Sequence, residues 1–202
     1  MASIPRSFYL GDTVEIARSL IGKYLMRSYR GETLLGRITE TEAYIGRMDK
    51  ACHAYAYRRT PRTEVMFGEA GHAYIYFTYG MHHCLNIVTE AVGEPSAVLI
   101  RSMEPILGTE TMAQLRFQRS YEQFTSYQRK NFLNGPGKLC QALALTREEN
   151  GLDLLGDVLS CYDSADDFGL PDAPLGTIAS GKRIGIDYAE EAVDFPWRFY
   201  LK

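Results

Sequence analysis

Two β-prone runs separated by a tight turn constrain the fold most strongly. The segment 72–79, HAYIYFTY, is rich in aromatic and β-branched residues, which favour strands. A second run, 82–90, HHCLNIVTE, follows directly after Gly80 and Met81. Glycine between two such runs favours a hairpin turn, because it adopts positive φ without strain. The two runs are therefore expected to form an antiparallel β-hairpin with its tip near residues 79–82.

Other segments supply further strands and several helices. Residues 12–21 suit an amphipathic helix, because Asp12 can cap its start and Gly22 stands where a helix can stop. The long connections 47–70 and 120–134 are expected to be an ordered loop and a polar surface connection. Strands are expected at 23–29, 33–45, 96–103 and 182–186, and helices at 108–119 and 136–145.

This order of elements indicates one α+β domain. Several neighbouring strands are followed by helices, a pattern typical of α+β proteins with a mostly antiparallel sheet. A chain of 202 residues, 46% of them hydrophobic, is long enough for a single domain with a sizeable core. We therefore expect a single compact domain over residues 1–202.

The net charge and the cysteines limit the class of protein. A formal net charge of −3 argues against a protein that coats nucleic acid through many phosphate contacts, although it is compatible with a local basic region. No run of about 18 or more apolar residues could span a membrane, and the first residues lack a signal-peptide pattern. The four cysteines are scattered, which favours free thiols in a reducing compartment. We expect a cytoplasmic protein without a membrane partner.

An unusual pair of acids lies in the segment 36–46, GRITETEAYIG. Side chains two apart on a strand share a face, so Glu40, Glu42 and Tyr44 are expected to point the same way. On an exposed face the two carboxylates are merely solvated, whereas a buried glutamate needs partners or a chemical role. A buried glutamate could act as a general base for water. The pair could also serve a sugar hydrolase, although one strand face would then have to reach both sides of a glycosidic bond.

Aromatic and basic residues offer two candidate binding surfaces. Tyr79, at the expected hairpin tip, is badly placed for a core and well placed for insertion into a partner, unless the tip packs locally. The segment 53–62, HAYAYRRTPR, contains three basic residues and no acid: Arg58, Arg59 and Arg62. Lys138 lies at a helix start flanked by proline and glycine. Both places could bind anions or simply be solvated.

The histidines do not follow a known metal-binding pattern. The candidate ligands are His53, His72, His82 and His83, with Glu42 as a carboxylate. His82 and His83 are adjacent on an expected strand and therefore face opposite ways, and no H-E-x-x-H or H-x-H spacing occurs. Signatures of phosphate loops, nucleophile elbows and dinucleotide folds are absent as well. We expect no metal and no cofactor.

Nine segments, taken together, resemble one known family. In chain order they are LIGKYLMR (20–27), GRITETEAYIG (36–46), DKACHA (49–54), RRTPRTEVMF (58–67), YIYFTYGMHHCLNI (74–87), AVLIRSMEP (97–105), NGPGKLCQAL (134–143), KRIGI (182–186) and WRFY (197–200). The chain thus resembles the alkyladenine (3-methyladenine) DNA glycosylases, with the motifs E-T-E-A-Y-x-G, Y-G-M and G-P-x-K-L-C-Q-A-L as the most specific matches. Residues 106–133 and 146–181 match least.

The resemblance implies a monofunctional enzyme of base excision repair. Such an enzyme flips alkylated or deaminated purines out of double-stranded DNA, cuts the N-glycosidic bond with water and leaves an abasic site. The resemblance also implies one compact domain, built on a curved, mostly antiparallel sheet surrounded by helices. A β-hairpin would project to the DNA, and the enzyme would act as a monomer.

The resemblance assigns the catalytic positions. Glu42 matches the glutamate that deprotonates the attacking water, and Arg101 matches an arginine that helps to hold that water. Ile184 matches the residue whose main-chain carbonyl contacts the same water. Glu40 is left as a structural or supporting residue, since spacing alone cannot distinguish the two acids.

Further positions are assigned to recognition of the base. Aromatic walls around the extruded base would be Tyr44, His53 and Tyr76. Asn86 matches a polar residue at the pocket edge that can clash with the amino group of normal guanine. Tyr79 matches the side chain that fills the gap left by the flipped nucleotide, and Met81 and His82 would support it.

Two departures and one alternative complete the sequence-based account. His82 stands where vertebrate members have tyrosine, and the chain lacks their long N-terminal extension, which indicates a bacterial-type enzyme associated with the nucleoid through DNA. The DNA backbone would be contacted by Arg58, Arg59, Arg62 and Lys138. Which damaged purine is preferred stays open. The alternative is a nucleic-acid-binding module of the same fold without catalysis.

Overall fold

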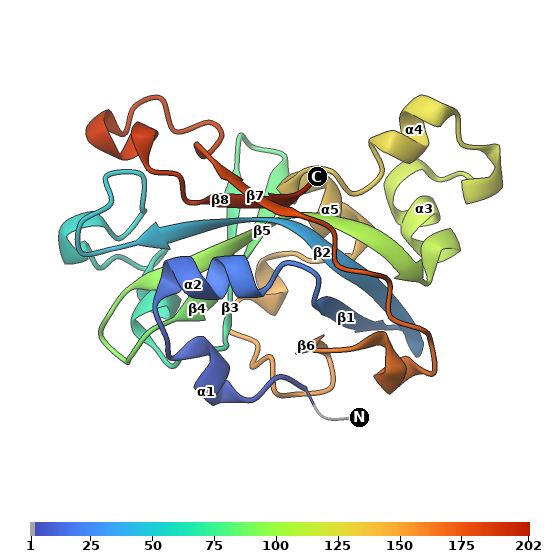
Figure 1. Cartoon of the computed structure of the whole chain (residues 1–202), viewed down its shortest axis with the longest axis horizontal. Helices are drawn as coiled ribbons and strands as arrows, with labels where there is room; N and C mark the ends of the chain where they lie inside the picture. Colours follow the sequence, from blue (N-terminus) through green and yellow to red (C-terminus); the bar gives the residue numbers. More distant parts are fainter. Residues whose placement is uncertain (1–2) are drawn as a thin grey trace.

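In the computed structural model, residues 3–202 are described, and over this range the chain forms one eight-stranded antiparallel sheet that curls around a compact core (Figure 1). The main path of the sheet runs in the order β3-β4-β5-β2-β1-β6, and β8 pairs with β2 and with β7. The strands are β1 (Tyr24–Tyr29), β2 (Glu32–Ile45), β3 (Ala73–Thr78), β4 (His82–Thr89), β5 (Ser96–Leu107), β6 (Leu159–Tyr162), β7 (Ile178–Gly181) and β8 (Arg198–Leu201). The expected α+β class with an antiparallel sheet is confirmed.

Short helices cover the sheet. They are α1 (Arg6–Tyr9), α2 (Thr13–Ser19), α3 (Thr109–Phe117), α4 (Ser126–Lys130) and α5 (Pro136–Ala142). Asp12 caps α2 as expected, since its carboxylate accepts the backbone N–H groups of Val14 and Glu15 at 2.9 and 3.0 Å. None of the helices in the described part of the chain is long and apolar enough to cross a membrane.

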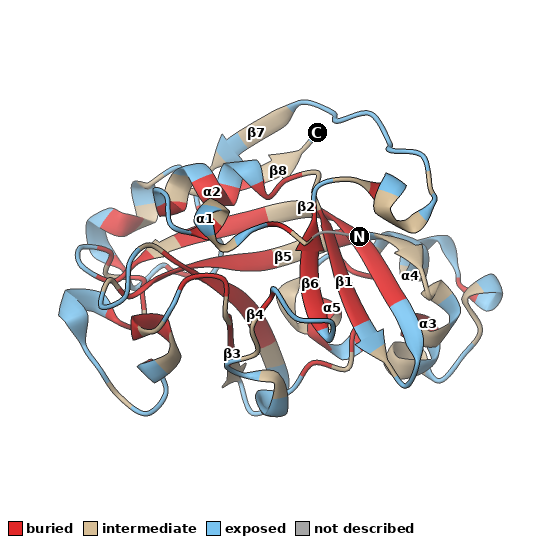
Figure 2. Cartoon of the chain, turned by 90° about the horizontal axis from the view of Figure 1, so that it is seen from below, coloured by how far each residue is buried: buried red, intermediate tan, exposed pale blue. Residues whose placement is uncertain are grey.

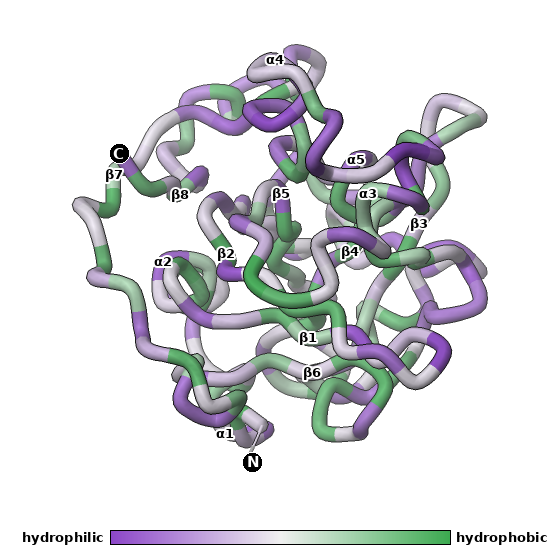
Figure 3. Tube along the Cα trace, turned by 90° about the vertical axis from the view of Figure 1, so that its right-hand side faces the viewer, coloured by the Kyte–Doolittle hydropathy of each residue, from purple (hydrophilic) through white to green (hydrophobic). Residues whose placement is uncertain are grey.

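The core fills the space enclosed by the sheet and the helices. The strands β1, β2, β4 and β6 are buried over most of their length (Figure 2). Hydrophilic stretches lie mainly in the outer loops and around α4 (Figure 3). All four cysteines are free and buried, as expected from their scattered spacing.

The centre of β2 is irregular, and this irregularity matters for the site. Glu40 pairs with Ser102 of β5 and Thr41 pairs with Ile100, so Arg101 is an extra residue in a β-bulge. At this point β2 also changes its second neighbour from β1 to β8. On the face toward α2, the Thr41 hydroxyl donates to the Ala17 carbonyl at 2.7 Å. Because side chains alternate along a strand, Glu42 points to the opposite face.

Two expectations from the sequence were wrong. Residues 120–134 are not a plain connection, because they contain a 3₁₀ turn and α4, which begins with a capping box at Thr125 and Gln128. Residues 182–186 do not form a strand; β7 ends just before them at Gly181. Gly185 has a φ of +76°, which is incompatible with an extended strand.

Candidate active site

A cavity of about 200 Å³ opens between the β3–β4 hairpin, the segment 184–188 and the start of α5. Its walls combine aromatic rings with a few polar groups, a composition typical of sites that bind flat organic molecules. The lining side chains that enter the argument below are Tyr44, His53, Tyr74, Tyr76, Tyr79, Asn86, Arg101, Ile184 and Tyr188.

The Glu42 carboxylate lies behind these walls with no solvent exposure. One oxygen, Oε2, accepts the Tyr44 hydroxyl at 2.7 Å and lies 3.4 Å from Nη1 of Arg101. The other oxygen, Oε1, accepts the backbone N–H of Ile184 at 2.8 Å. A carboxylate has about four lone-pair positions, so this arrangement leaves room for one further donor such as water.

Burial is the main influence on the ionisation of Glu42. It raises the pKa of the carboxyl above the ordinary value of 4.5, and the charge of Arg101, the Tyr44 hydroxyl and the Ile184 N–H oppose this effect. The nearby charge of Glu40 raises the pKa further. A carboxylate with a raised pKa is a stronger base than an ordinary glutamate, which suits it to accept a proton from water.

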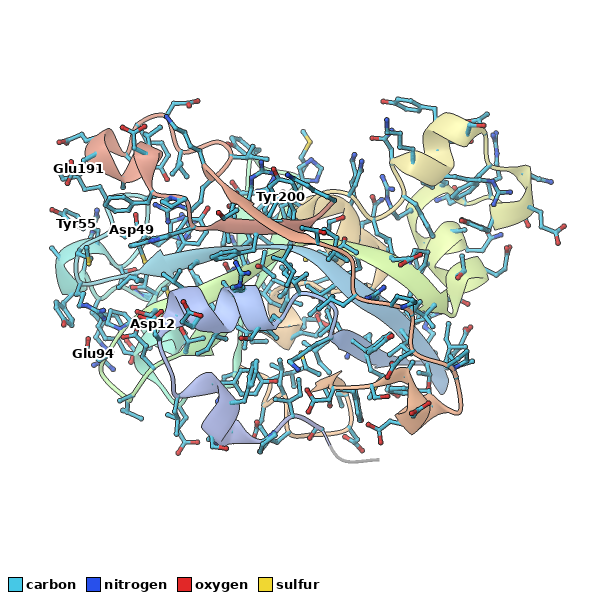
Figure 4. All side chains as sticks on the ribbon, in the orientation of Figure 1. Asp12, Asp49, Tyr55, Glu94, Glu191 and Tyr200 are labelled. Carbon is cyan, nitrogen blue, oxygen red and sulfur yellow. The ribbon has the colours of Figure 1, made fainter. Side chains whose placement is uncertain are left out.

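The segment that supplies the Ile184 N–H is anchored by a buried ion pair. Both nitrogens Nη1 and Nη2 of Arg183 donate to the Asp49 carboxylate, at 2.5 and 2.7 Å, and neither side chain is exposed. Arg183 also donates to the carbonyls of Ala43 and Ala192. In Figure 4, Asp49 lies between the end of β2 and the C-terminal segment that carries Glu191. The pair thus ties the loop 182–186 to the strand that carries Glu42.

The Arg183 guanidinium also fixes one wall of the cavity. It lies 4.7 Å from the ring centroid of Tyr44 and 5.2 Å from that of Trp197. Cation–π contacts of this kind orient an aromatic ring as well as stabilise it. The same ion pair therefore supports both Glu42 partners, Tyr44 and Ile184, which lie on different segments.

The opposite wall is a packed aromatic group. The rings of His53 and Tyr76 meet edge to face with centroids 4.6 Å apart, and Tyr74 lies 5.6 Å from Tyr76. The two tyrosines share a face of β3, as the alternation of the sequence predicts. Asn86 on the neighbouring strand donates its amide to the carbonyls of Tyr74 and Cys84, at 3.0 and 3.3 Å. This fixes its amide plane beside the aromatic wall.

Hydrogen bonds define the protonation of His53. Arg62 can only donate, and its Nη2 lies 3.2 Å from Nε2 of His53, so Nε2 accepts and the proton is on Nδ1, 3.0 Å from the Tyr74 hydroxyl. Burial, with a smaller contribution from the Arg62 charge, lowers the pKa of His53 to about 4. His53 is therefore a neutral wall at physiological pH.

This lowered pKa predicts how stability depends on pH. Between the unfolded value of about 6.5 and the folded value of about 4, the unfolded chain binds a proton at this position and the folded chain does not. Stability is thus fully present above about pH 6.5 and falls as the pH decreases, by at most about 3 kcal/mol from this group. His53→Gln is expected to flatten the decline, measured by urea unfolding at several pH values. An unchanged slope would contradict the assignment.

The hairpin tip is exposed and strained. Tyr79 and Met81 are 82% and 69% exposed, although both are large and apolar. Tyr79 and Gly80 have φ values of +51° and +65°, and the Met81 N–H donates to the Thr78 carbonyl at 3.2 Å. Positive φ at both central residues is the requirement of a type I′ turn, which favours Asn-Gly rather than Tyr-Gly. A tyrosine held there against its conformational preference suggests a functional reason.

His82 packs against the start of α5. A methyl group added at Gly137 would lie within 3.0 Å of the His82 ring, so only glycine permits this close approach. The contact braces the hairpin tip from the side of the helix. It also explains why a glycine occupies the first turn of α5 despite its low helix propensity.

The predicted basic residues have different surroundings. Arg59 forms a two-pronged pair with Glu64, just beyond the segment noted in the sequence, at 2.9 and 2.5 Å. Arg62 contacts His53 and lies 5.0 Å from the centroid of Tyr76. Lys138 donates to Asn131 and Asn134 and so holds the loop before α5. Arg58 is exposed, and no salt bridge involves it among the described residues.

The histidines do not converge. Within residues 3–202, no group of three or more His, Cys, Asp or Glu side chains is arranged to hold a metal ion. His53 is part of the cavity wall, His82 packs on Gly137, and His72 contacts Arg6 at the far end of β3.

The structure therefore brings together most of the residues selected from the sequence. Those that line the cavity are Tyr44, His53, Tyr76, Tyr79, Asn86, Arg101 and Ile184, with Glu42 directly behind them. Those outside it are Met81, His82, Arg58, Arg59, Arg62 and Lys138. Sequence reasoning missed Tyr188 at the rim and the Asp49–Arg183 pair. The only local signal for Arg183 was its place in the KRIGI segment.

Known proteins match this sequence along nearly the whole chain. A model of the family described as methylpurine-DNA glycosylase (MPG) matches residues 7–202. A protein of Clostridium perfringens strain 13, named as an inferred 3-methyladenine DNA glycosylase, is 49% identical over 197 residues, which cover 98% of this chain and 94% of that protein. Proteins with the same name from Desulfitobacterium hafniense strain Y51 and Bacillus cereus strain G9842 are 48% and 50% identical. They cover 100% and 98% of this chain, and 96% and 95% of their own length is matched.

Proposed function

This chain belongs to the methylpurine-DNA glycosylase family, and we propose that it extrudes a damaged purine from duplex DNA into the cavity and hydrolyses the N-glycosidic bond with a water activated by Glu42. One observation carries this proposal most directly. Within residues 3–202, the polar groups that contact the buried Glu42 carboxylate belong to Tyr44, Arg101 and Ile184, and these residues all line the aromatic cavity.

The proposed chemistry needs a base and a positioned water. The water oxygen attacks C1′ of the deoxyribose, its proton passes to Glu42, and the C1′–N bond breaks with its electron pair leaving on the purine. A purine nucleotide methylated at N3 or N7 is cationic, and its base leaves in neutral form, so it needs little help from an acid. The negative charge of Glu42 also stabilises the positive charge that develops on the sugar.

The lining of the cavity favours hydrolysis over a covalent route. Among residues 3–202, no lysine lines the cavity, so no lysine amine of this range is placed to form a Schiff base with the sugar. Glu40 and Glu42 both contact Arg101 from one strand. They cannot flank a glycosidic bond as the acid and base of a sugar hydrolase do. These features support a monofunctional glycosylase.

Recognition would depend on the aromatic walls. Tyr44, His53 and Tyr76 are electron-rich and desolvated, and they would attract a cationic base by roughly 0.5–2 kcal/mol per contact. His53 is suited to this role because it stays neutral above about pH 4. Extrusion costs a few kcal/mol and is easiest for damaged, weakly paired bases, which adds to the selectivity.

The exposed hairpin tip is the proposed wedge. Tyr79 would enter the duplex and replace the stacking lost when the nucleotide flips, with His82 bracing the tip against α5. Arg58 is free to contact a phosphate, whereas Arg59, Arg62 and Lys138 would have to exchange their present partners to do so.

Replacing Tyr79 is expected to stabilise the protein but to impair base flipping. Tyr79→Asn creates the Asn-Gly pair that a type I′ turn prefers and should raise stability by about 0.5–1 kcal/mol. The same variant should flip a fluorescent 1,N6-ethenoadenine less, because the stacking surface is lost. Thermal melts and lesion fluorescence in a duplex measure the two effects. A variant that flips like the wild type would remove Tyr79 from the proposal.

The function is tested by base release without metal. The protein is incubated in EDTA with duplexes that carry 3-methyladenine, 7-methylguanine, hypoxanthine or ethenoadenine, and abasic sites are detected by alkaline cleavage. We expect release of at least one alkylated purine, with the free base recovered by chromatography. Tight binding to every duplex without any release would instead indicate a non-catalytic DNA-binding module.

A further inference from the structure

Glu40 occupies a position that the reaction itself does not explain. Its Oε1 accepts hydrogen bonds from Nε of Arg101 at 3.2 Å and from Nη1 of Arg198 at 2.8 Å. Its side chain is 18% exposed, and those of Arg101 and Arg198 are 12% and 23% exposed. A half-buried acid with two arginines is more than a solvated strand face.

Arg101 bridges the two acids with different edges of its guanidinium. Its Nε faces Glu40, and its Nη1 lies 3.4 Å from Oε2 of Glu42. Charge-assisted contacts are usually about 2.7–2.9 Å long, so the contact with Glu42 is loose. Because the guanidinium is a rigid plane, its contact with Glu40 also sets its distance from Glu42.

Arg198 completes the arrangement from the third strand. Besides contacting Glu40, it donates Nε to the Lys182 carbonyl at 2.9 Å, two residues before Ile184. Its β8 position pairs directly with Glu42 in the sheet register. Arg198 therefore joins Glu40 to the loop that supplies the second contact of Glu42.

We propose that Glu40 is a positioning residue for base release, which holds Arg101 in a loose contact with Glu42, and that Arg198 neutralises Glu40 in that role. The inference rests on the proposed function of Glu42. If Glu40 were absent, Arg101 would be free to close on Glu42 and form a tight ion pair. Glu42 would then be a weaker base, and the guanidinium would move from the place where it can orient water.

Titratable and charged groups surround Glu42 on several elements. Tyr44 and Glu40 lie on β2, Arg101 on β5 and Cys84 on β4, and Arg198 on β8 pairs with Glu40. Arg183 contributes from the loop, where Asp49 balances its charge. Burial and the charge of Glu40 raise the pKa of Glu42, and Arg101 lowers it. Removal of the Glu40 charge should therefore lower this pKa.

Two variants with opposite predicted signs test the inference. Glu40→Gln should slow single-turnover release of 3-methyladenine from dimethyl sulfate-treated duplex DNA about tenfold at neutral pH, and should move the acidic limb of the rate profile to lower pH. Arg198→Gln removes one of the two arginine partners of Glu40, so Glu40 should pull Arg101 closer to itself and away from Glu42. The pKa of Glu42 should then rise, and the acidic limb should move to higher pH. A general loss of structure cannot produce opposite shifts.

Glu104→Gln is the matched control. Glu104 lies on β5 and is exposed, and its replacement changes the net charge by the same amount as Glu40→Gln does. It should retain the wild-type rate, profile and duplex affinity. Thermal melts of all three variants exclude unfolding as the cause.

A titration separates this inference from the function on which it rests. The ionisation of the Glu42 carboxyl, followed by ¹³C NMR, should shift to lower pH in Glu40→Gln and to higher pH in Arg198→Gln. If the wild type releases no base, the proposed function fails and the role in catalysis fails with it, whatever the titration shows. If the wild type releases base but Glu40→Gln keeps the wild-type rate and limb, the positioning role alone is overturned.

Discussion

Asp49→Asn is expected to destabilise the fold by about 3–5 kcal/mol, because it leaves the Arg183 guanidinium buried without its counter-charge. Both side chains are fully buried, so water cannot replace the lost partner. Among residues 3–202, Nε of Arg183 already has no hydrogen-bond partner, and the variant would add to this deficit. Urea unfolding monitored by circular dichroism measures the loss.

A matched substitution on the surface provides the control. Asp194 pairs with Lys182 at 2.5 Å, but 74% and 64% of these side chains are exposed. Asp194→Asn removes the same charge and should leave the melting temperature nearly unchanged, since exposed ion pairs contribute little. If Asp49→Asn melts like this control, the buried pair does not anchor the loop 182–186.

Local patterns in the sequence were sufficient for the main elements. The hairpin, the capped helix α2 and the strand with the two acids are all present close to their expected bounds. These elements follow from short-range rules, because turn chemistry, capping and the alternation of side chains involve residues near one another. The shared face of Glu42 and Tyr44 is confirmed by their hydrogen bond.

Long-range contacts determine the structural features that could not be predicted from the sequence. Arg183 and Asp49 are 134 positions apart, and the Ile184 N–H reaches Glu42 across 142 positions. The apolar alternation of KRIGI predicts a strand, but the buried ion pair and a glycine with positive φ make it a loop. No local sequence pattern shows that these contacts override the strand preference of the segment.

The bulge at Arg101 is a second feature that local sequence rules do not predict. It results from two strands whose register is shifted, and it turns the guanidinium toward both acids of β2. The roles of Arg58 and Lys138 at DNA, and the monomeric state, stay predictions.

Glu42→Gln is expected to reduce base release by about 10²–10⁴-fold, the usual contribution of a general base. Glutamine has nearly the same size and can still accept the Ile184 N–H, so the cavity should keep its shape. Duplex affinity should remain within about twofold, since Glu42 is fully buried and does not face the DNA surface. Loss of release with intact binding would separate chemistry from recognition.

The most direct test is therefore the single-turnover rate of abasic-site formation by the wild type and by Glu42→Gln on the same methylated duplex, at saturating protein. The proposal predicts rapid excision by the wild type and almost none by the variant, with equal binding of both. Excision at the wild-type rate by Glu42→Gln would contradict it, because another group would then have to activate the water.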